Sequence, residues 1–170
     1  MKWSVLTLVG ADQPGIVASV TDALFKQGCS LAQASMMRLG ANFSIMLRVS
    51  HADETKLNEV LGDICSSMGL HLHIDEDATN GNELEEPDVQ VTVYGADRSG
   101  IVAQVTSVLA EAGLNIIDLE TDVGGSTDKP IYIMTMEGIA INGIEPLQEA
   151  LQSLDDDIEV NLDEISTLRG

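Results

Sequence analysis

The residues with the clearest chemical potential form a short loop that occurs twice. Gly10–Ala18 reads Gly-Ala-Asp-Gln-Pro-Gly-Ile-Val-Ala, and Gly95–Ala103 reads Gly-Ala-Asp-Arg-Ser-Gly-Ile-Val-Ala. Each copy places a carboxylate and a glycine directly before an apolar run with helical spacing. The N–H groups at the start of a helix, and the positive end of its dipole, favour a carboxylate or another anion. Such a loop, with an acidic side chain beside it, can hold both ends of a zwitterion such as a free amino acid.

The same residues also have a purely structural interpretation. Asp, Pro and Gly are ordinary capping and turn residues before a helix. Finding the loop twice in the same position favours a binding role, but duplication of a module would also duplicate a structural cap. The loop residues are therefore compatible with both a binding role and a structural role.

The spacing of apolar residues predicts the elements that position the first loop. Pro14 suits the first position of a helix, where its missing N–H costs nothing. The predicted order is a strand over 3–9, a helix from 14 to Gly28, strands over 31–39 and 43–49 joined by a turn at 40–42, a helix over 57–68 and a strand over 70–75.

The second half of the chain repeats this order after a polar segment. Residues 77–87 contain four acidic residues and almost nothing apolar, which predicts an exposed linker. Then come a strand over 89–93, a helix from 101 to Gly113, strands over 114–123 and 131–136 with a longer loop at 124–130, a helix over 144–154 and a strand over 158–162. The sequence thus predicts two modules, 1–76 and 88–170.

Strand-helix-strand twice in each module indicates an α+β, ferredoxin-like βαββαβ fold. We expect a four-stranded antiparallel sheet with two helices on one face of each module. Modules this small are marginal alone. We therefore expect them to pair side by side, within one chain or in a homodimer, which would also remove an exposed sheet edge.

The chain is strongly acidic, with 28 Asp and Glu against eight Lys and Arg. Residues 1–80 hold nine acidic and five basic residues, and residues 81–170 hold 19 and three. Because affinity for nucleic acid comes largely from Lys and Arg, this balance argues against direct nucleic-acid binding and against anionic lipid. No stretch approaches the 18 apolar residues of a membrane span. The second half could still dock on a basic protein partner.

Other chemically interesting residues form no complete site. His71, His73 and Asp75 point the same way on a predicted strand. Two histidines at positions i and i+2 can bind zinc, but no third and fourth ligand with fitting spacing is evident to join His71 and His73. The two cysteines, Cys29 and Cys65, indicate a reducing, cytoplasmic setting, with Cys65 in the core. No catalytic motif is found, so we expect neither an enzyme nor a metal or cofactor. Four methionines are expected near a sheet face used by a partner: Met36, Met37, Met134 and Met136.

The doubled loop, each copy followed by a helix and by Gly28-Cys29-Ser30-Leu31 or Gly113-Leu114-Asn115-Ile116, resembles the ACT domain. The two copies cover nearly the whole chain. Tandem ACT domains without a catalytic domain resemble the glycine cleavage system transcriptional repressor family, and Met37-Arg38-Leu39-Gly40 leading to Phe43-Ser44 adds to that likeness.

The resemblance implies a ligand held between two modules. The strand–helix loop of one module would face the start of the second strand of the other, where ACT domains commonly carry Asn after the helix-ending glycine. Asn115 matches that position, whereas Ser30 replaces it in the first module. The better predicted site joins Asp12, Gln13, Pro14 and Gly15 to Asn115. The weaker site joins Asp97, Arg98, Ser99 and Gly100 to Ser30.

The resemblance also implies the function. We expect a non-catalytic regulatory protein that binds a small amino acid such as glycine or serine and controls transcription through a protein partner. Glycine has so few heavy atoms that it could not bind much more tightly than the μM range, which suits a sensor. The alternative is a protein-interaction module with a vestigial ligand site.

Overall fold

The computed structural model describes residues 1–170 except 78, 80–84, 97–98, 127–128, 155–156 and 166–170. The chain divides into two compact units, Met1–Leu84 and Glu85–Gly170. No helix in the described parts is long and apolar enough to cross a membrane.

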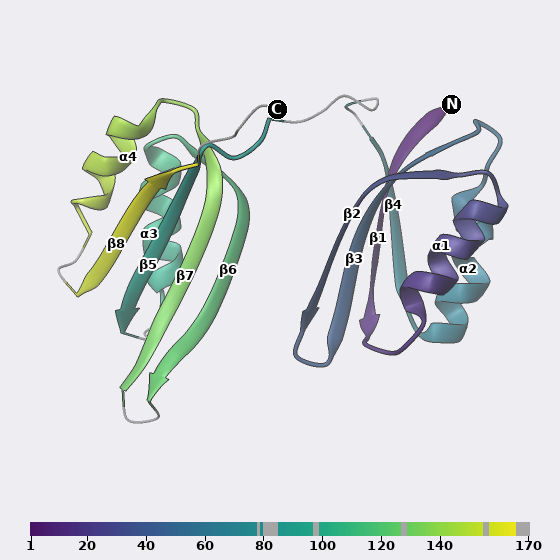
Figure 1. The fold of residues 1–170 in the computed structure, drawn as a ribbon, viewed down its shortest axis with the longest axis horizontal. Helices are drawn as coiled ribbons and strands as arrows, with labels where there is room; N and C mark the ends of the chain where they lie inside the picture. Colours follow the sequence, from purple (N-terminus) through teal and green to yellow (C-terminus); the bar gives the residue numbers. More distant parts are fainter. Residues whose placement is uncertain (78, 80–84, 97–98, 127–128, 155–156, 166–170) are drawn as a thin grey trace. The chain divides into compact units, whose positions relative to one another are not determined.

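The first unit has the predicted order of elements (Figure 1). They are β1 (Lys2–Ala11), α1 (Ile16–Lys26), β2 (Ser30–Leu39), β3 (Asn42–His51), α2 (Leu57–Met68) and β4 (His71–Glu76). The strands form one antiparallel sheet in the order β2-β3-β1-β4, and both helices lie on the same face. The βαββαβ prediction is confirmed.

The second unit repeats this topology. Its elements are β5 (Val89–Ala96), α3 (Ile101–Glu111), β6 (Leu114–Ser126), β7 (Lys129–Ala140), α4 (Ile144–Leu151) and β8 (Ile158–Glu164). The sheet order is β6-β7-β5-β8, again antiparallel. Two modules of one fold are therefore present.

Each core lies between the sheet and its two helices. Alternate residues of the central strand β1 point toward the helices, so Leu6 and Leu8 are fully buried. They pack with the buried side of β3 and with the apolar stripes of α1 and α2, which include Val20, Leu61 and the predicted core residue Cys65. Burial of apolar surface of this kind is the main favourable term in folding.

The edge strand β2 is exposed along its whole length. Its register places Met36 opposite Ile45 and Arg38 opposite Phe43, and both partners are buried. Met36 and Arg38 therefore point to the helix side of the sheet, yet α1 does not cover them. This uncovered strip borders the candidate site.

Three details differ from the sequence predictions. The first is the longer loop expected at 124–130, which is wrong: β6 continues to Ser126, and Gly125 pairs with Pro130 of β7. Because β5 ends at Ala96, opposite Ile131, this hairpin continues beyond the rest of the sheet. At Pro130, β7 therefore pairs with β6 but not with β5. The missing N–H of the proline thus costs no hydrogen bond between β7 and β5.

The second difference concerns Asp77, which was expected in an exposed linker but is buried on the first unit. Arg48 Nε donates to Asp77 Oδ2 at 2.7 Å, and Thr79 Oγ1 donates to Oδ1 at 2.6 Å. Hydrogen bonds from Thr79, followed by Arg48, lower the pKa of the Asp77 carboxyl to about 2. A charged side chain can be buried here because it is paired and hydrogen-bonded.

The third difference concerns the methionines expected near an open sheet face. Met36 and Met37 are exposed on β2, but Met134 and Met136 are buried in the second core. The latter two lie on β7, opposite Val93 and Val91, on the helix side of the sheet.

Candidate functional site

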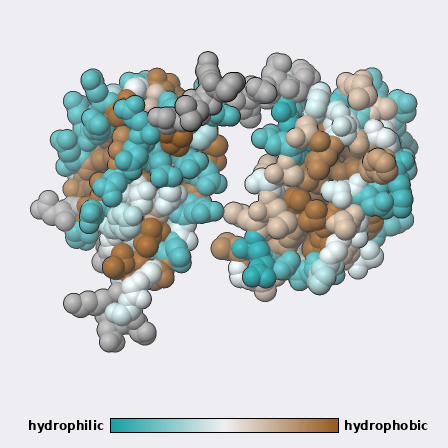
Figure 2. All heavy atoms as spheres, viewed as in Figure 1, coloured by the Kyte–Doolittle hydropathy of each residue, from teal (hydrophilic) through white to brown (hydrophobic). Residues whose placement is uncertain are grey.

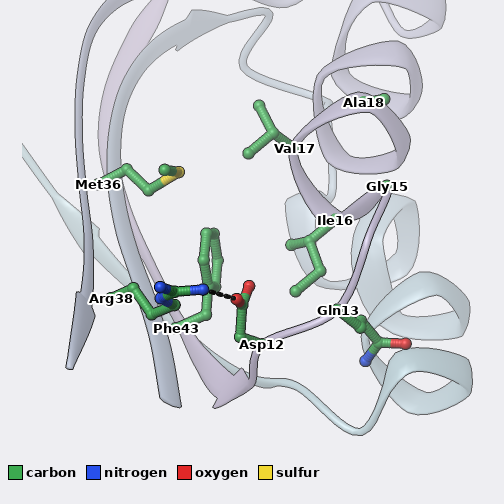
Figure 3. A pocket seen from close by; sticks show the side chains of 9 residues that line it. All are labelled: Asp12, Gln13, Gly15, Ile16, Val17, Ala18, Met36, Arg38 and Phe43. Carbon is green, nitrogen blue, oxygen red and sulfur yellow. Dashed lines mark hydrogen bonds and ion pairs between the residues drawn. The ribbon is translucent and has the colours of Figure 1, made fainter. Parts of the chain in front are cut away.

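A hollow of about 450 Å³ lies in the first unit between the start of α1 and the edge strand β2 (Figure 3). It is lined by the β1–α1 loop, the first turn of α1, two β2 side chains and Phe43. Three residues of the better predicted site, Asp12, Gln13 and Gly15, are among its lining. The volume falls in the usual range of small-molecule pockets, roughly 300–1,000 Å³.

A left-handed turn at Gly15 leads into the hollow. Gly15 has φ 91° and ψ −1°, and Gly100 has φ 91° and ψ −2°. These angles fit the third residue of a type II turn, where glycine is required and Pro is common just before it. Pro14 therefore belongs to this turn, two residues before α1 begins at Ile16, and its predicted place at the first helical position is wrong.

The start of α1 is open to a ligand. Within the described part of the chain, no side chain caps this helix, and its first turn contains no acidic residue. The first N–H groups of a helix have no partner within the helix, so they are available to an anion.

Two opposite charges meet at one end of the hollow. Arg38 Nη1 lies 3.4 Å from Asp12 Oδ2, and the arginine side chain is 68% exposed. Arg38 reaches this position because the β2–β3 register turns it to the uncovered helix side of the sheet. The guanidinium, the carboxylate and the helix start together provide groups for an anion and a cation.

The side chain of Gln13 points away from the hollow (Figure 3). Its Nε2 donates to the carbonyl oxygen of Met68, the last residue of α2, at 2.7 Å. The amide therefore ties the β1–α1 loop to the end of the second helix.

The remaining predicted residues lie apart from this hollow or outside the described residues. Asp97 and Arg98 fall outside them, whereas Ser99 and Gly100 are exposed in the turn before α3. Ser30 is at the end of β2 that pairs with Ser50, opposite the Arg38 end. Asn115 is exposed near the start of β6 in the second unit.

Arg38 was not among the predicted site residues. The sequence signal that could have identified Arg38 is its position two residues after Met36, on the same face of the predicted strand 31–39. In the second unit, Val123 lies opposite Tyr132 as Arg38 lies opposite Phe43, and Thr121 takes the place of Met36. The strand β6 thus offers no matching cation at this position.

On β4, a contact within the predicted histidine cluster joins His73 to Asp75. His73 Nε2 lies 3.1 Å from Asp75 Oδ2, with both side chains exposed. Among the residues that the structure describes, no three His, Cys, Asp or Glu side chains gather as metal ligands. Cys29 and Cys65 are free thiols, and burial raises the pKa of both.

Comparison with known proteins gives matches in both halves. Residues 4–75 and residues 89–156 each match the ACT domain. A UPF0237 protein of Methanococcus maripaludis is 35% identical over 75 residues, which are 44% of this chain and 82% of that protein. A UPF0237 protein of Methanopyrus kandleri is 35% identical over 72 residues, which are 42% and 79% of the two chains.

Two solved structures match over nearly the full length. An unknown protein from Galdieria sulphuraria has a TM-score of 0.81 at 23% identity, covering 97% of this chain and 99% of the other. A protein provisionally assigned as a glycine cleavage system transcriptional repressor has a TM-score of 0.70 at 18% identity, covering 98% of each chain. At these identities the likeness concerns the fold.

Proposed function

The chain belongs to the ACT domain family, with one domain in each half, and we propose on this basis that it is a non-catalytic regulatory protein that binds an amino acid. The observation that supports this most is the hollow of the first unit. There, the uncapped start of α1, the Arg38 guanidinium and the Asp12 carboxylate surround one space.

The groups around the hollow suit the two charges of an α-amino acid. The α-carboxylate would accept hydrogen bonds from Arg38 and from the first N–H groups of α1, and the α-ammonium would donate to Asp12. Without a ligand, Arg38 and Asp12 neutralise one another. Because an exposed ion pair contributes only about 0–1 kcal/mol, opening it for a ligand costs little.

The ACT resemblance supports a larger site than one unit provides. We propose that Asn115 joins Asp12, Pro14 and Gly15, within one chain or between two chains of a homodimer. A weaker site would join Ser30 to Asp97, Arg98, Ser99 and Gly100. The hydrogen bond from Gln13 to Met68 favours a structural role for the Gln13 amide over direct ligand contact.

We propose that the readout is a change in binding to a protein partner, in the control of transcription in the cytoplasm. A structural relative is provisionally assigned as a transcriptional repressor. The excess of acidic residues disfavours direct contact with DNA and suits a basic protein surface. The amino acid would act by favouring one arrangement of the modules, since a ligand shifts an equilibrium only through differential affinity.

A thermal-shift screen against each common amino acid at millimolar concentration tests the ligand. One or a few amino acids should raise the melting temperature. At a ligand concentration of about 100 times Kd, binding stabilises the folded chain by about 2.7 kcal/mol. Asp12→Ala should abolish the shift. Asp22→Ala is the matched control, since Asp22 is an exposed acid paired with Lys26 on α1. An unchanged midpoint with every amino acid would contradict ligand binding.

The second candidate is an interaction module with a vestigial ligand site. Exposed apolar side chains on the sheet of the first unit, including Met37, Leu39 and Met46, favour a protein-binding surface. This candidate predicts that Asp12→Ala and Asn115→Ala leave both partner binding and its response to amino acids unchanged. Affinity capture with and without amino acid separates the two candidates.

A further inference from the structure

The hollow beside α1 has two chemically different ends. Figure 3 shows Arg38 and Asp12 together at one end, while Met36 and Val17 face each other across the other end. The ring of Phe43 lies between the two ends. A ligand that fills this space therefore needs a charged head and an apolar tail.

The apolar end is exposed although it continues the core. Met36 is 58% exposed and Val17 is 40% exposed, whereas Phe43 and Ile16 beside them are buried. Figure 2 shows apolar side chains gathered on this unit between its strands and α1. An apolar group placed here would be buried against Met36 and Val17, and burial of such surface is favourable.

The charged end selects a zwitterion. A ligand with a carboxylate alone would place its charge near Asp12, and a ligand with an ammonium alone would place its charge near Arg38. When a ligand separates Arg38 from Asp12, each of the two side chains needs a new partner of opposite charge. Only a molecule with both a carboxylate and an ammonium provides both partners.

We propose that the first unit selects an α-amino acid with an apolar side chain, with Arg38 binding the α-carboxylate and Met36 contacting the side chain. This inference rests on the proposed function and differs from the expected glycine or serine. A hollow of about 450 Å³ is within the usual range of small-molecule pockets, roughly 300–1,000 Å³, and leaves room for a side chain beside the two charged groups of an amino acid.

The second unit offers a natural contrast. The counterparts of Met36 and Arg38 on β6 are Thr121 and Val123, so the second unit has a polar, uncharged residue in place of Met36 and an apolar residue in place of Arg38. The selectivity described here therefore belongs to the first unit.

Titration calorimetry of the whole chain with leucine, glycine, serine, isoamylamine and 4-methylpentanoate tests the proposal. Leucine should bind at least about tenfold more tightly than glycine or serine, as expected for apolar groups in an apolar pocket. The amine lacks a carboxylate and 4-methylpentanoate lacks an ammonium, so both should bind at least about tenfold more weakly than leucine.

Two pairs of variants assign the roles. Met36→Ser should remove most of the preference for leucine over glycine, while Met37→Ser should keep it. Met37 is the next residue of the same strand, is 53% exposed, and points to the opposite face. Arg38→Met should weaken leucine binding at least about tenfold, while Lys26→Met, which removes another exposed cation, should not.

Each outcome separates this inference from the proposed function. If glycine or serine binds as tightly as leucine, the inference is overturned and amino-acid binding stands. If no amino acid binds, both are overturned. If leucine binds tightly and Met36→Ser keeps the preference, the assigned orientation of the ligand is wrong.

Discussion

Arg38 shows how one side chain can distinguish two copies of a fold. Arg38 places a positive charge on the exposed strand β2, whereas the corresponding position of β6 is Val123. Its partner, Asp12, is part of the doubled loop, but the arginine itself is not. The two loops are therefore alike in sequence, while the edge strands β2 and β6 differ at this position.

Replacing Arg38 should separate binding from stability. We expect Arg38→Met to change the free energy of unfolding by no more than about 0.5 kcal/mol, because the Arg38–Asp12 pair is exposed and screened by solvent. Urea unfolding checks this. A loss of several kcal/mol would show that Arg38 supports the fold, and the binding test would then need a different variant.

Asp77 makes the first unit sensitive to acid. Its pKa is about 2 in the folded chain, against an ordinary value of 3.8, because Thr79 and Arg48 donate hydrogen bonds to the carboxylate. A lowered pKa in the folded state means that this stabilisation is complete above about pH 4 and is lost as the pH falls toward 2.

We therefore expect Asp77→Asn to lower stability at pH 7 and to reduce the loss between pH 4 and pH 2. Trp3, the single tryptophan, lies under Arg48 with 5.2 Å between the guanidinium carbon and the ring centroid, so its fluorescence can follow urea unfolding. Asp63→Asn, at an exposed position of α2, is the control. Equal acid sensitivity of the wild-type and Asp77→Asn chains would contradict this role.

At the scale of elements, the turn before each first helix is fixed by glycine. A Cβ at Gly15 would meet no atom within 4 Å, so the requirement comes from φ 91° and not from crowding. Left-handed backbone costs an L-residue about 1–2 kcal/mol. The left-handed conformation explains why both copies have glycine at this position, Gly15 and Gly100. The residue before it has no such requirement and is Pro14 in one copy and Ser99 in the other.

Two glycine substitutions should have opposite effects. Gly15→Ala should destabilise the first unit by about 1 kcal/mol or more. Gly62→Ala should stabilise it by up to about 1 kcal/mol, since Gly62 lies inside α2 with open space around it. Thermal unfolding of the two variants compares them directly. Effects of the same sign would contradict the backbone argument.

At the scale of the whole molecule, the charge is distributed unequally. Residues 85–170 carry 18 acidic and three basic residues, whereas residues 1–84 carry ten and five. Like charges in one compact unit repel each other, and salt screens this repulsion over about 10 Å at 0.1 M. The second unit should therefore depend more on ionic strength.

We expect fragments 1–84 and 85–170 to fold separately, because each has its own core, and to have the low stability typical of modules of this size. Raising NaCl from about 0.01 M to about 0.3 M should increase the melting temperature of the second fragment more than that of the first. Calorimetry of the two fragments measures this. Equal shifts would show that the excess charge does not destabilise the second unit.

Much of the fold could be predicted because its signals are local. Helix α2 was predicted with its observed bounds from the spacing of apolar residues and from Gly69 at its end. The hairpin of β6 and β7 was shortened in the prediction because Gly124, Gly125 and Pro130 are typical of loops. Pairing between the strands overrides that tendency.

The candidate site could be predicted only in part. The doubled loop predicted Asp12 and Gly15 as site residues, and both line the hollow. Gln13 was chosen for its place in the same loop, but a residue 55 positions away in sequence accepts its hydrogen bond. Neither this contact nor the pairing of Arg38 with Asp12 is readable from neighbouring residues.

The sequence by itself determined the two modules, their order of elements and the loop that begins each first helix, because periodicity and turn chemistry act between near neighbours. Only the tertiary structure decided that Arg38 meets Asp12, that Met36 faces Val17 and that Asp77 is buried. These results depend on strand register and on how far the helices cover the sheet. Both are set by packing between residues that are distant in the chain.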